Sequence, residues 1–252
     1  MPPRSEYGTQ YRISFGGPLT QAVKALLIIN VAVFVIELFI VGRGGQEAWE
    51  VTLALLALNP ILVFKSFFVW QLVTYMFLHS PDSIFHLLFN MLVLWMFGCE
   101  IERLWGARRF LRYYLICGVG AGVANCALAF MQPQTVGASG AIFGLIVAYG
   151  MLFPGSIVYF WGIFPMTARQ FALLMAAIEL VSLGALTPDG VARFAHLGGA
   201  LTGFILIMGY WDPRRLINAI RWRLRRRRFK TIERDDARRS DRSNRDRHYP
   251  YH

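Results

Sequence analysis

Six apolar stretches dominate this sequence and leave only short polar connections and one long loop between them. Stretches of about 17 to 25 apolar residues have the length that a helix needs to cross the ~30 Å hydrocarbon core of a bilayer. We therefore predict an all-α membrane protein, a bundle of six transmembrane helices in which a short fourth helix is central. The expected spans are residues 22–42, 84–104, 109–130, 139–153, 168–186 and 192–210.

The charge of the chain supports this division. Only 16% of the residues are charged, against about 25% in an average soluble domain. Residues 213–252 hold fifteen Lys and Arg and five acidic residues, so they carry +10 of the net +11. We predict a cytoplasmic N-terminal segment (1–21), a membrane domain (22–210) and a basic, disordered cytoplasmic tail (211–252). Beside a membrane span such a tail is expected to contact anionic lipid rather than nucleic acid.

The distribution of Lys and Arg also predicts the orientation. These residues gather before the first span, between the second and third, at the start of the fifth and after the sixth. The positive-inside rule then places both termini in the cytoplasm. The first external loop, residues 43–83, is rich in Trp and Phe and is expected to lie in the interface. Because the first residues carry no transit-peptide pattern, a bacterial inner membrane is the expected location.

The cysteines predict no chemistry. Cys99, Cys117 and Cys126 lie in or beside apolar stretches, at spacings that fit neither a metal site nor a redox pair. We interpret them as packing residues and expect neither a metal nor a cofactor.

Two polar residues inside the predicted spans require an explanation, because polar groups in hydrocarbon are costly. Ser139 begins the fourth span and His196 lies about four residues, or roughly 6 Å, into the sixth. The fifteen residues of the fourth span reach only about 22 Å, so its outer end should begin about 8 Å below the external surface. The serine and the histidine are therefore expected at the same depth.

Small residues permit these two helices to approach closely. Gly140 and Gly144 follow the serine, and Gly199 and Gly203 follow the histidine, each as a small-xxx-small pair. A serine hydroxyl becomes a good nucleophile when a neighbouring imidazole takes its proton.

A third group lies at the external start of the second span. His86 and Asn90 are spaced i, i+4 and share one helical face. Together with the backbone N–H of Ser139, both side chains could donate hydrogen bonds to a developing oxyanion.

These motifs together resemble the rhomboid family of intramembrane serine proteases. The resemblance covers residues 60–210 and includes Gly137-Ala138-Ser139-Gly140, His86-xxx-Asn90, His196-xx-Gly199-xxx-Gly203 and Gly98-xxx-Glu102-xxx-Gly106. It implies that Ser139 is the nucleophile, that His196 is the general base, and that His86 and Asn90 bind the oxyanion. It also implies that Phe143 stacks on the histidine, and that the glycines of these motifs (Gly137, Gly140, Gly199 and Gly203) support the site.

The same resemblance implies the substrates, which would be single-span or other transmembrane proteins. The fifth helix and the neighbouring loop, residues 187–193, would form the gate through which they enter. The chain departs from the family in having Trp70-Gln71 where Trp-Arg is common, which leaves open how the first loop is held.

Other interpretations remain open. A serine in a membrane helix often bonds only to its own backbone. Glu37 and Glu179 lie inside predicted spans; either could orient His196, although the family uses a Ser–His pair, and we expect both to form hydrogen bonds between helices. The chain could also be a non-catalytic rhomboid-like protein that binds membrane clients, a small transporter, or a membrane scaffold that uses its basic tail.

Overall fold

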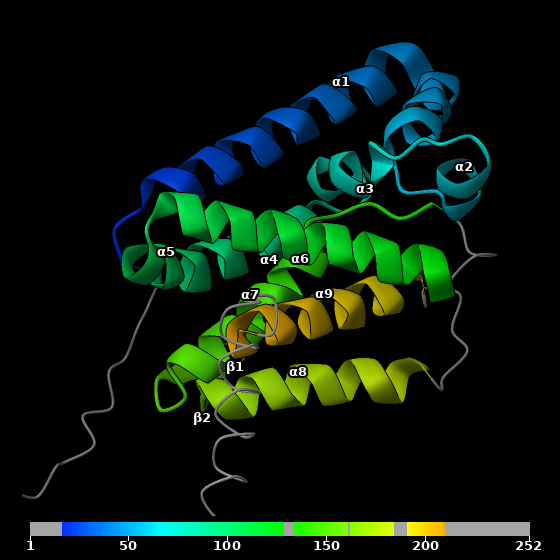
Figure 1. Cartoon of the computed structure of the whole chain (residues 1–252). Helices are drawn as coiled ribbons and strands as arrows, with labels where there is room; N and C mark the ends of the chain where they lie inside the picture. Colours follow the sequence, from blue (N-terminus) through cyan, green and yellow to red (C-terminus); the bar gives the residue numbers. More distant parts are fainter. Residues whose placement is uncertain (1–16, 129–133, 161, 184–190, 210–252) are drawn as a thin grey trace, which may run out of the picture. The chain divides into compact units, whose positions relative to one another are not determined.

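A computed structural model describes residues 17–128, 134–160, 162–183 and 191–209 and is mostly helical (Figure 1). Residues Met1–Ile207 form one compact unit, to which the following description refers. The basic tail and most of the predicted N-terminal segment lie outside the described residues. The elements, in chain order, are α1 (Gln21–Leu56), α2 (Pro60–Lys65), α3 (Gln71–Thr74), η1 (Tyr75–Phe77), α4 (Ile84–Val93), η2 (Leu94–Gly98), α5 (Cys99–Trp105), α6 (Ala107–Leu128), α7 (Ser139–Leu152), β1 (Ile157–Phe160), β2 (Phe164–Thr167), α8 (Ala168–Leu183) and α9 (Val191–Met208).

Helices lie at all six positions predicted for spans, and α4, η2 and α5 run on from one another over the second. Within the described residues, three helices are long and apolar enough to cross a membrane: Gln21–Leu56, Ile84–Trp105 and Ala107–Leu128. Two further apolar helices, Ser139–Leu152 and Arg193–Met208, are shorter. The number of six crossings therefore stays a prediction.

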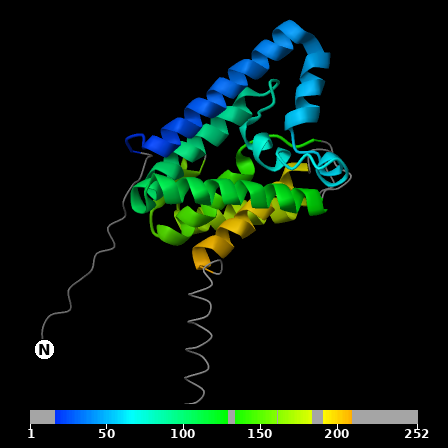
Figure 2. The same cartoon turned by 45° about the horizontal axis from the view of Figure 1, so that its top comes forward.

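The predicted first loop is largely helical. Helix α1 continues beyond the expected end at residue 42 and reaches Leu56, with a bend at Gly45 that is visible in Figure 2. Gly45 has φ 67° and ψ −168°, a conformation that glycine adopts without steric cost. The residues after the bend, QEAWEVTLALL, are mostly good helix formers, which explains why the helix resumes.

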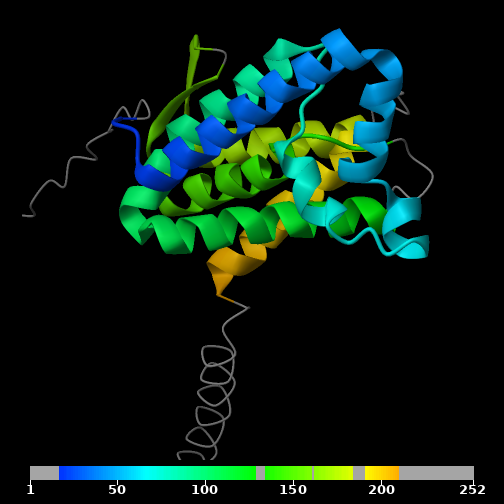
Figure 3. The same ribbon diagram turned by 90° about the horizontal axis from the view of Figure 1, so that it is seen from above.

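Two short strands were not predicted and are an exception to the all-α class. β1 pairs with β2 in antiparallel register, with Ile157 opposite Thr167 and Phe160 opposite Phe164. Figure 3 shows the pair extending away from the helices. The segment lies between the fourth and fifth predicted spans, where its apolar residues show no polar alternation that would have indicated a strand.

The beginning of α1 is held by Glu102 of α5. The Glu102 carboxylate accepts hydrogen bonds from the backbone N–H groups of Ala22 and Val23, both at 2.9 Å, and from the Thr20 hydroxyl. Two of the four N–H groups that a helix leaves without an intrahelical partner are thereby satisfied, and the negative charge faces the positive end of the helix dipole. The Gly98-xxx-Glu102-xxx-Gly106 motif thus joins two helices.

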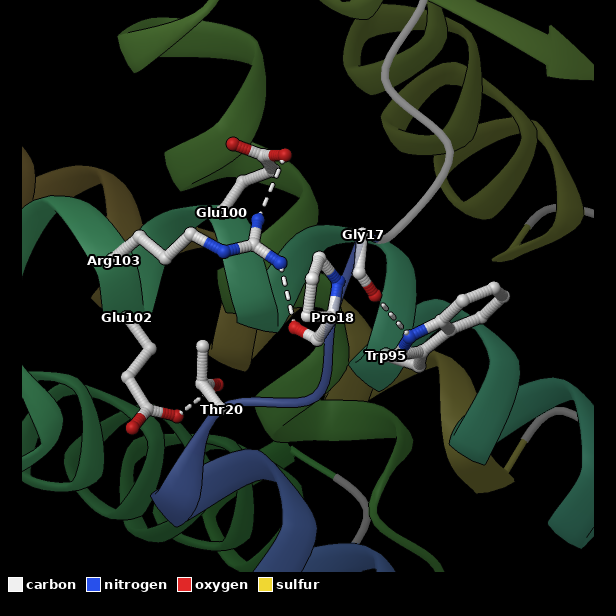
Figure 4. Close-up of polar contacts among 7 residues, drawn as sticks. All are labelled: Gly17, Pro18, Thr20, Trp95, Glu100, Glu102 and Arg103. Carbon is white, nitrogen blue, oxygen red and sulfur yellow. Dashed lines mark hydrogen bonds and ion pairs between the residues drawn. The ribbon is translucent and has the colours of Figure 1, made fainter.

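Further contacts bind the segment just before α1 to the same region (Figure 4). The guanidinium of Arg103 donates to the Pro18 carbonyl at 2.7 Å and forms an ion pair with Glu100 at 2.9 Å. The Trp95 indole N–H donates to the Gly17 carbonyl at 3.2 Å.

Helix α7 is the buried centre of the unit, in agreement with the predicted short central helix. It runs between α6 and α8 (Figures 1 and 3), and its backbone also lies close to that of α9. Small residues occupy many of its positions and allow neighbouring backbones to approach closely. Its buried residues are Gly140, Ala141, Ile142, Gly144, Leu145, Ile146, Ala148, Tyr149 and Gly150.

Candidate active site

Ser139 is the first residue of α7, and the first loop holds the segment before it. The backbone N–H of Gly137 donates to the carbonyl of Tyr75 at 2.9 Å. Leu58 and Thr135 exchange two backbone hydrogen bonds, at 3.0 and 2.9 Å, as in a short antiparallel bridge. Because the serine begins a helix, its own N–H belongs to the first turn, whose donors have no intrahelical acceptor.

Gly199 makes the contact between α9 and α7 possible. A Cβ atom on Gly199 would lie 1.9 Å from the carbonyl oxygen of Gly140, and one on Gly203 would lie 2.9 Å from the Cα of Gly144. Any side chain at either position would overlap the α7 backbone. The two glycine pairs, which the sequence showed to permit a close approach, lie against one another in the structure.

This approach brings the two predicted residues into contact. The distance between His196 Nε2 and Ser139 Oγ is 2.7 Å, a good hydrogen bond. The ring of Phe143 stacks on the imidazole, with 4.4 Å between ring centroids and 13° between the planes. Both side chains of the pair remain partly exposed. The arrangement allows the imidazole to take a proton from the hydroxyl.

The other imidazole nitrogen contacts a carboxylate. His196 Nδ1 lies 2.9 Å from Oε1 of Glu179 on α8. The expectation that Glu179 bonds to a neighbouring helix is therefore confirmed. The other carboxylate, Glu37, accepts instead from the loop backbone N–H of His79, at 3.0 and 3.2 Å.

His86 lies beside Gly137. A Cβ atom on Gly137 would be 2.8 Å from Cε1 and Nε2 of His86 and 3.8 Å from Ser139 Oγ. Gly137 also has φ +122°, which L side chains rarely adopt. The absence of a side chain at this position leaves the imidazole of His86 close to the serine.

Asn90 is oriented by His79, a loop residue for which the sequence left open whether it orients the site or has no catalytic role. Its Nδ2–H donates to Nε2 of His79 at 3.2 Å. Burial, with a smaller contribution from the neighbouring His86, lowers the pKa of His79 from 6.5 to about 4. His79 is therefore neutral at neutral pH and can accept the bond. The only signal in the sequence was a histidine seven residues before His86.

The side chain of Gln71 holds the first loop at the position where the family commonly has arginine. Its buried side chain accepts from the Asn59 N–H at 3.0 Å and donates to the Ala54 carbonyl at 2.9 Å. The Trp70 indole N–H donates to the Leu55 carbonyl at 2.8 Å. A neutral amide thus bonds both to the end of α1 and to the turn that follows.

No group of three His, Cys, Asp or Glu side chains within the described ranges could hold a metal ion. The expectation of a site without metal or cofactor stays a prediction. The predicted gate loop, residues 187–193, lies mainly outside the described residues.

The apolar helices and the serine–histidine contact define an integral membrane protein with a candidate hydrolytic site between helices. A comparison with protein families gives a match to the rhomboid domain over residues 66–213. The chain belongs to the rhomboid family.

Individual relatives agree with this assignment. RHOMBOID-like protein 1 of Arabidopsis thaliana is 32% identical over 211 residues, which cover 73% of this chain and 51% of the relative. Rhomboid protease GluP of Bacillus subtilis is 30% identical over 186 residues, which cover 71% of this chain and 34% of the relative. Rhomboid protease AarA of Providencia stuartii is 28% identical over 203 residues, which cover 73% of this chain and 70% of the relative. The chain spans only 33% to 51% of the length of four Arabidopsis relatives that it matches.

Proposed function

We propose that this protein is an intramembrane serine endopeptidase that hydrolyses peptide bonds in or near the transmembrane segments of other membrane proteins. The observation that carries the proposal is the 2.7 Å distance between Ser139 Oγ and His196 Nε2. The two residues come from separate helices, and their meeting depends on glycines that leave room for it. Membership of a family whose bacterial relatives include named proteases supports the same class of activity.

In the proposed mechanism His196 takes the proton of Ser139 as the hydroxyl oxygen attacks the scissile carbonyl carbon. The carbonyl oxygen becomes an oxyanion, which needs donors aimed at its new position. The Ser139 N–H lies at the positive end of the α7 dipole and is one donor. The side chains of His86 and Asn90 are the others.

Collapse of the tetrahedral intermediate breaks the C–N bond, and His196 delivers its proton to the leaving amine. Water then attacks the acyl-enzyme with the same imidazole as base, and Ser139 is regenerated. Stacking on Phe143 holds the ring at the correct orientation through both half-reactions. Water must reach the site, and the partial exposure of Ser139 and His196 is compatible with this.

The substrate must present an extended segment to this serine. A transmembrane helix hides its carbonyls in intrahelical hydrogen bonds, so the scissile segment has to unwind first. We propose a preference for small residues at the cleaved bond and helix-weakening residues nearby. Access would be at α8 and the loop that follows it. The substrates would be single-span or other transmembrane proteins.

The cellular setting forms part of the proposal. The protein would lie in a bacterial inner membrane with both termini in the cytoplasm, where the tail, residues 211–252, contacts anionic lipid.

Co-expression with a panel of single-span reporter proteins tests the function. Wild type should release reporter fragments, whereas Ser139→Ala and His196→Ala should release none. A fluorophosphonate probe should label wild type and not Ser139→Ala, which identifies the nucleophile. A wild-type chain that neither cleaves nor takes the label would refute the proposal and favour a non-catalytic client-binding protein. If deletion of residues 213–252 abolished function while Ser139→Ala did not, the scaffold interpretation would be favoured.

A further inference from the structure

Glu179 occupies a position that the Ser–His mechanism alone does not use. It lies on α8, whereas Ser139 and His196 lie on α7 and α9. Its Oε1 is 2.9 Å from His196 Nδ1, while Nε2 of the same ring is 2.7 Å from Ser139 Oγ. The two side chains of the carboxylate–imidazole contact are only 14% and 16% exposed.

We infer that Glu179 is a positioning residue for His196, so that the site works as a Ser139–His196–Glu179 arrangement rather than as a Ser–His pair alone. The inference rests on the proposed function and deepens it. The sequence left open whether Glu37 or Glu179 could orient His196, and the structure places Glu179 against the imidazole.

The first part of the inference concerns the tautomer of the imidazole. An ionised carboxylate only accepts hydrogen bonds, so the ring nitrogen that faces it must carry the proton. With the proton on Nδ1, the lone pair of Nε2 faces the Ser139 hydroxyl. That is the tautomer a general base needs, and it resembles the function of the buried aspartate in soluble serine proteases.

The second part concerns the charge that develops during the reaction. His196 becomes an imidazolium when it takes the serine proton, and a carboxylate at 2.9 Å stabilises that cation. The low exposure of both side chains limits screening by solvent. Among the residues that the structure describes, Glu179 from α8 and His86 from α4 are titratable groups that interact with His196, and Glu179 is the acidic one of these two.

The third part concerns the orientation of the ring. Phe143 packs against one face of the imidazole and prevents tilting. Glu179 and Ser139 bond the two nitrogens at opposite edges and oppose rotation within the ring plane. If the contact only joined α8 to α9, any residue that preserved packing would replace Glu179 without changing the chemistry.

The test compares full-length wild type with Glu179→Gln, Glu179→Asp and the control Glu100→Gln in detergent or liposomes. Glu100 also contributes a carboxylate to an ion pair, with Arg103, and lies on α5 rather than on α7, α8 or α9. The readouts are kcat and KM for a cleaved reporter, the pH dependence of kcat/KM, the rate of fluorophosphonate labelling, and the thermal transition.

For Glu179→Gln we expect kcat to fall at least about 10-fold, with a ceiling near the roughly 10⁴-fold loss seen when the third member of a soluble triad is neutralised. KM and the thermal transition should change little. The labelling rate should fall with kcat. Because Glu179→Gln removes the carboxylate that contacts the imidazole, the pH profile of kcat/KM should differ from that of wild type. Glu179→Asp, which keeps the charge, should recover part of the loss, and Glu100→Gln should match wild type.

A Glu179→Gln enzyme with wild-type kcat, labelling rate and pH profile would overturn the inference and leave the proposed function intact. If Glu179→Gln fails to fold, the Glu179→Asp variant tests the inference instead. Its shorter carboxylate should lower kcat at unchanged KM. A wild-type kcat for Glu179→Asp would again overturn the inference. A wild type that neither cleaves nor labels would overturn both.

Discussion

Substitution of Gly199 should separate Ser139 on α7 from His196 on α9 by a distance that the structure gives. In the Gly199→Ala variant the new Cβ would lie 1.9 Å from the Gly140 carbonyl oxygen. Real Cβ atoms essentially never lie closer than 3.0 Å to a heavy atom, so the α7 and α9 backbones must separate locally by at least 1.1 Å. The obstacle is a backbone carbonyl in the first turn of α7, which no change of rotamer can move.

The consequence for the hydrogen bond follows from the same distance. An opening of 1.1 Å, added along the 2.7 Å vector between Ser139 Oγ and His196 Nε2, gives about 3.8 Å. This lies outside the range of a hydrogen bond, about 2.5 to 3.2 Å. Overpacking of this kind also costs about 1–3 kcal/mol of stability. We therefore expect a helical protein that is moderately destabilised and in which His196 no longer activates most of the Ser139 hydroxyl.

Fluorophosphonate labelling and reporter cleavage measure the loss, and circular dichroism with a thermal melt measures the fold. The control is Gly42→Ala, since a Cβ on this helical glycine of α1 would meet nothing within 4 Å. It should retain full labelling and be slightly stabilised, by about 0.5–1 kcal/mol. Wild-type labelling and cleavage by Gly199→Ala would refute the reasoning that close helix approach creates the serine–histidine contact.

Two further substitutions address stability. Glu102→Ala leaves the N–H groups of Ala22 and Val23 without their acceptor. Loss of such a cap should lower the stability measured by thermal unfolding by about 0.5–2 kcal/mol, while fluorophosphonate labelling of Ser139 persists. An unchanged melt would contradict this account of how α1 begins. His79 has its pKa lowered to about 4 by burial, whereas the unfolded chain titrates near 6.5. Stability should therefore fall as pH drops from about 6.5 towards 4, by up to about 3 kcal/mol. His79→Gln should flatten this dependence, measured as thermal unfolding against pH; an equally steep profile would show that another group causes it.

The sequence predicted much of this fold because hydrophobic length is a local property. A run of apolar residues must become a helix if it is to satisfy its backbone groups in lipid, and helices lie at all six expected positions. The helical first loop and the β1–β2 pair were missed for the opposite reason. A glycine bend at Gly45 and pairing between short apolar strands leave little periodic signal.

The contact between the serine and the histidine was also predictable, because it combines two local quantities. Span length and charge predicted a common depth for Ser139 and His196, which stays a prediction, and the glycine pairs permitted the close approach of their helices. What these residues do in a reaction stays a proposal.

Sequence alone predicted the positions of the helices from residue type and hydrophobic length, and its motifs, through their resemblance to the rhomboid family, predicted the class of protein and the pairing of Ser139 with His196. Only the tertiary structure decided the partners of those side chains. The structure shows hydrogen bonds from Asn90 to His79, from Gln71 to Ala54 and between Glu179 and His196, and each joins two different segments of the fold. Such contacts depend on how helices rotate and pack against one another, which no periodicity within a single helix encodes.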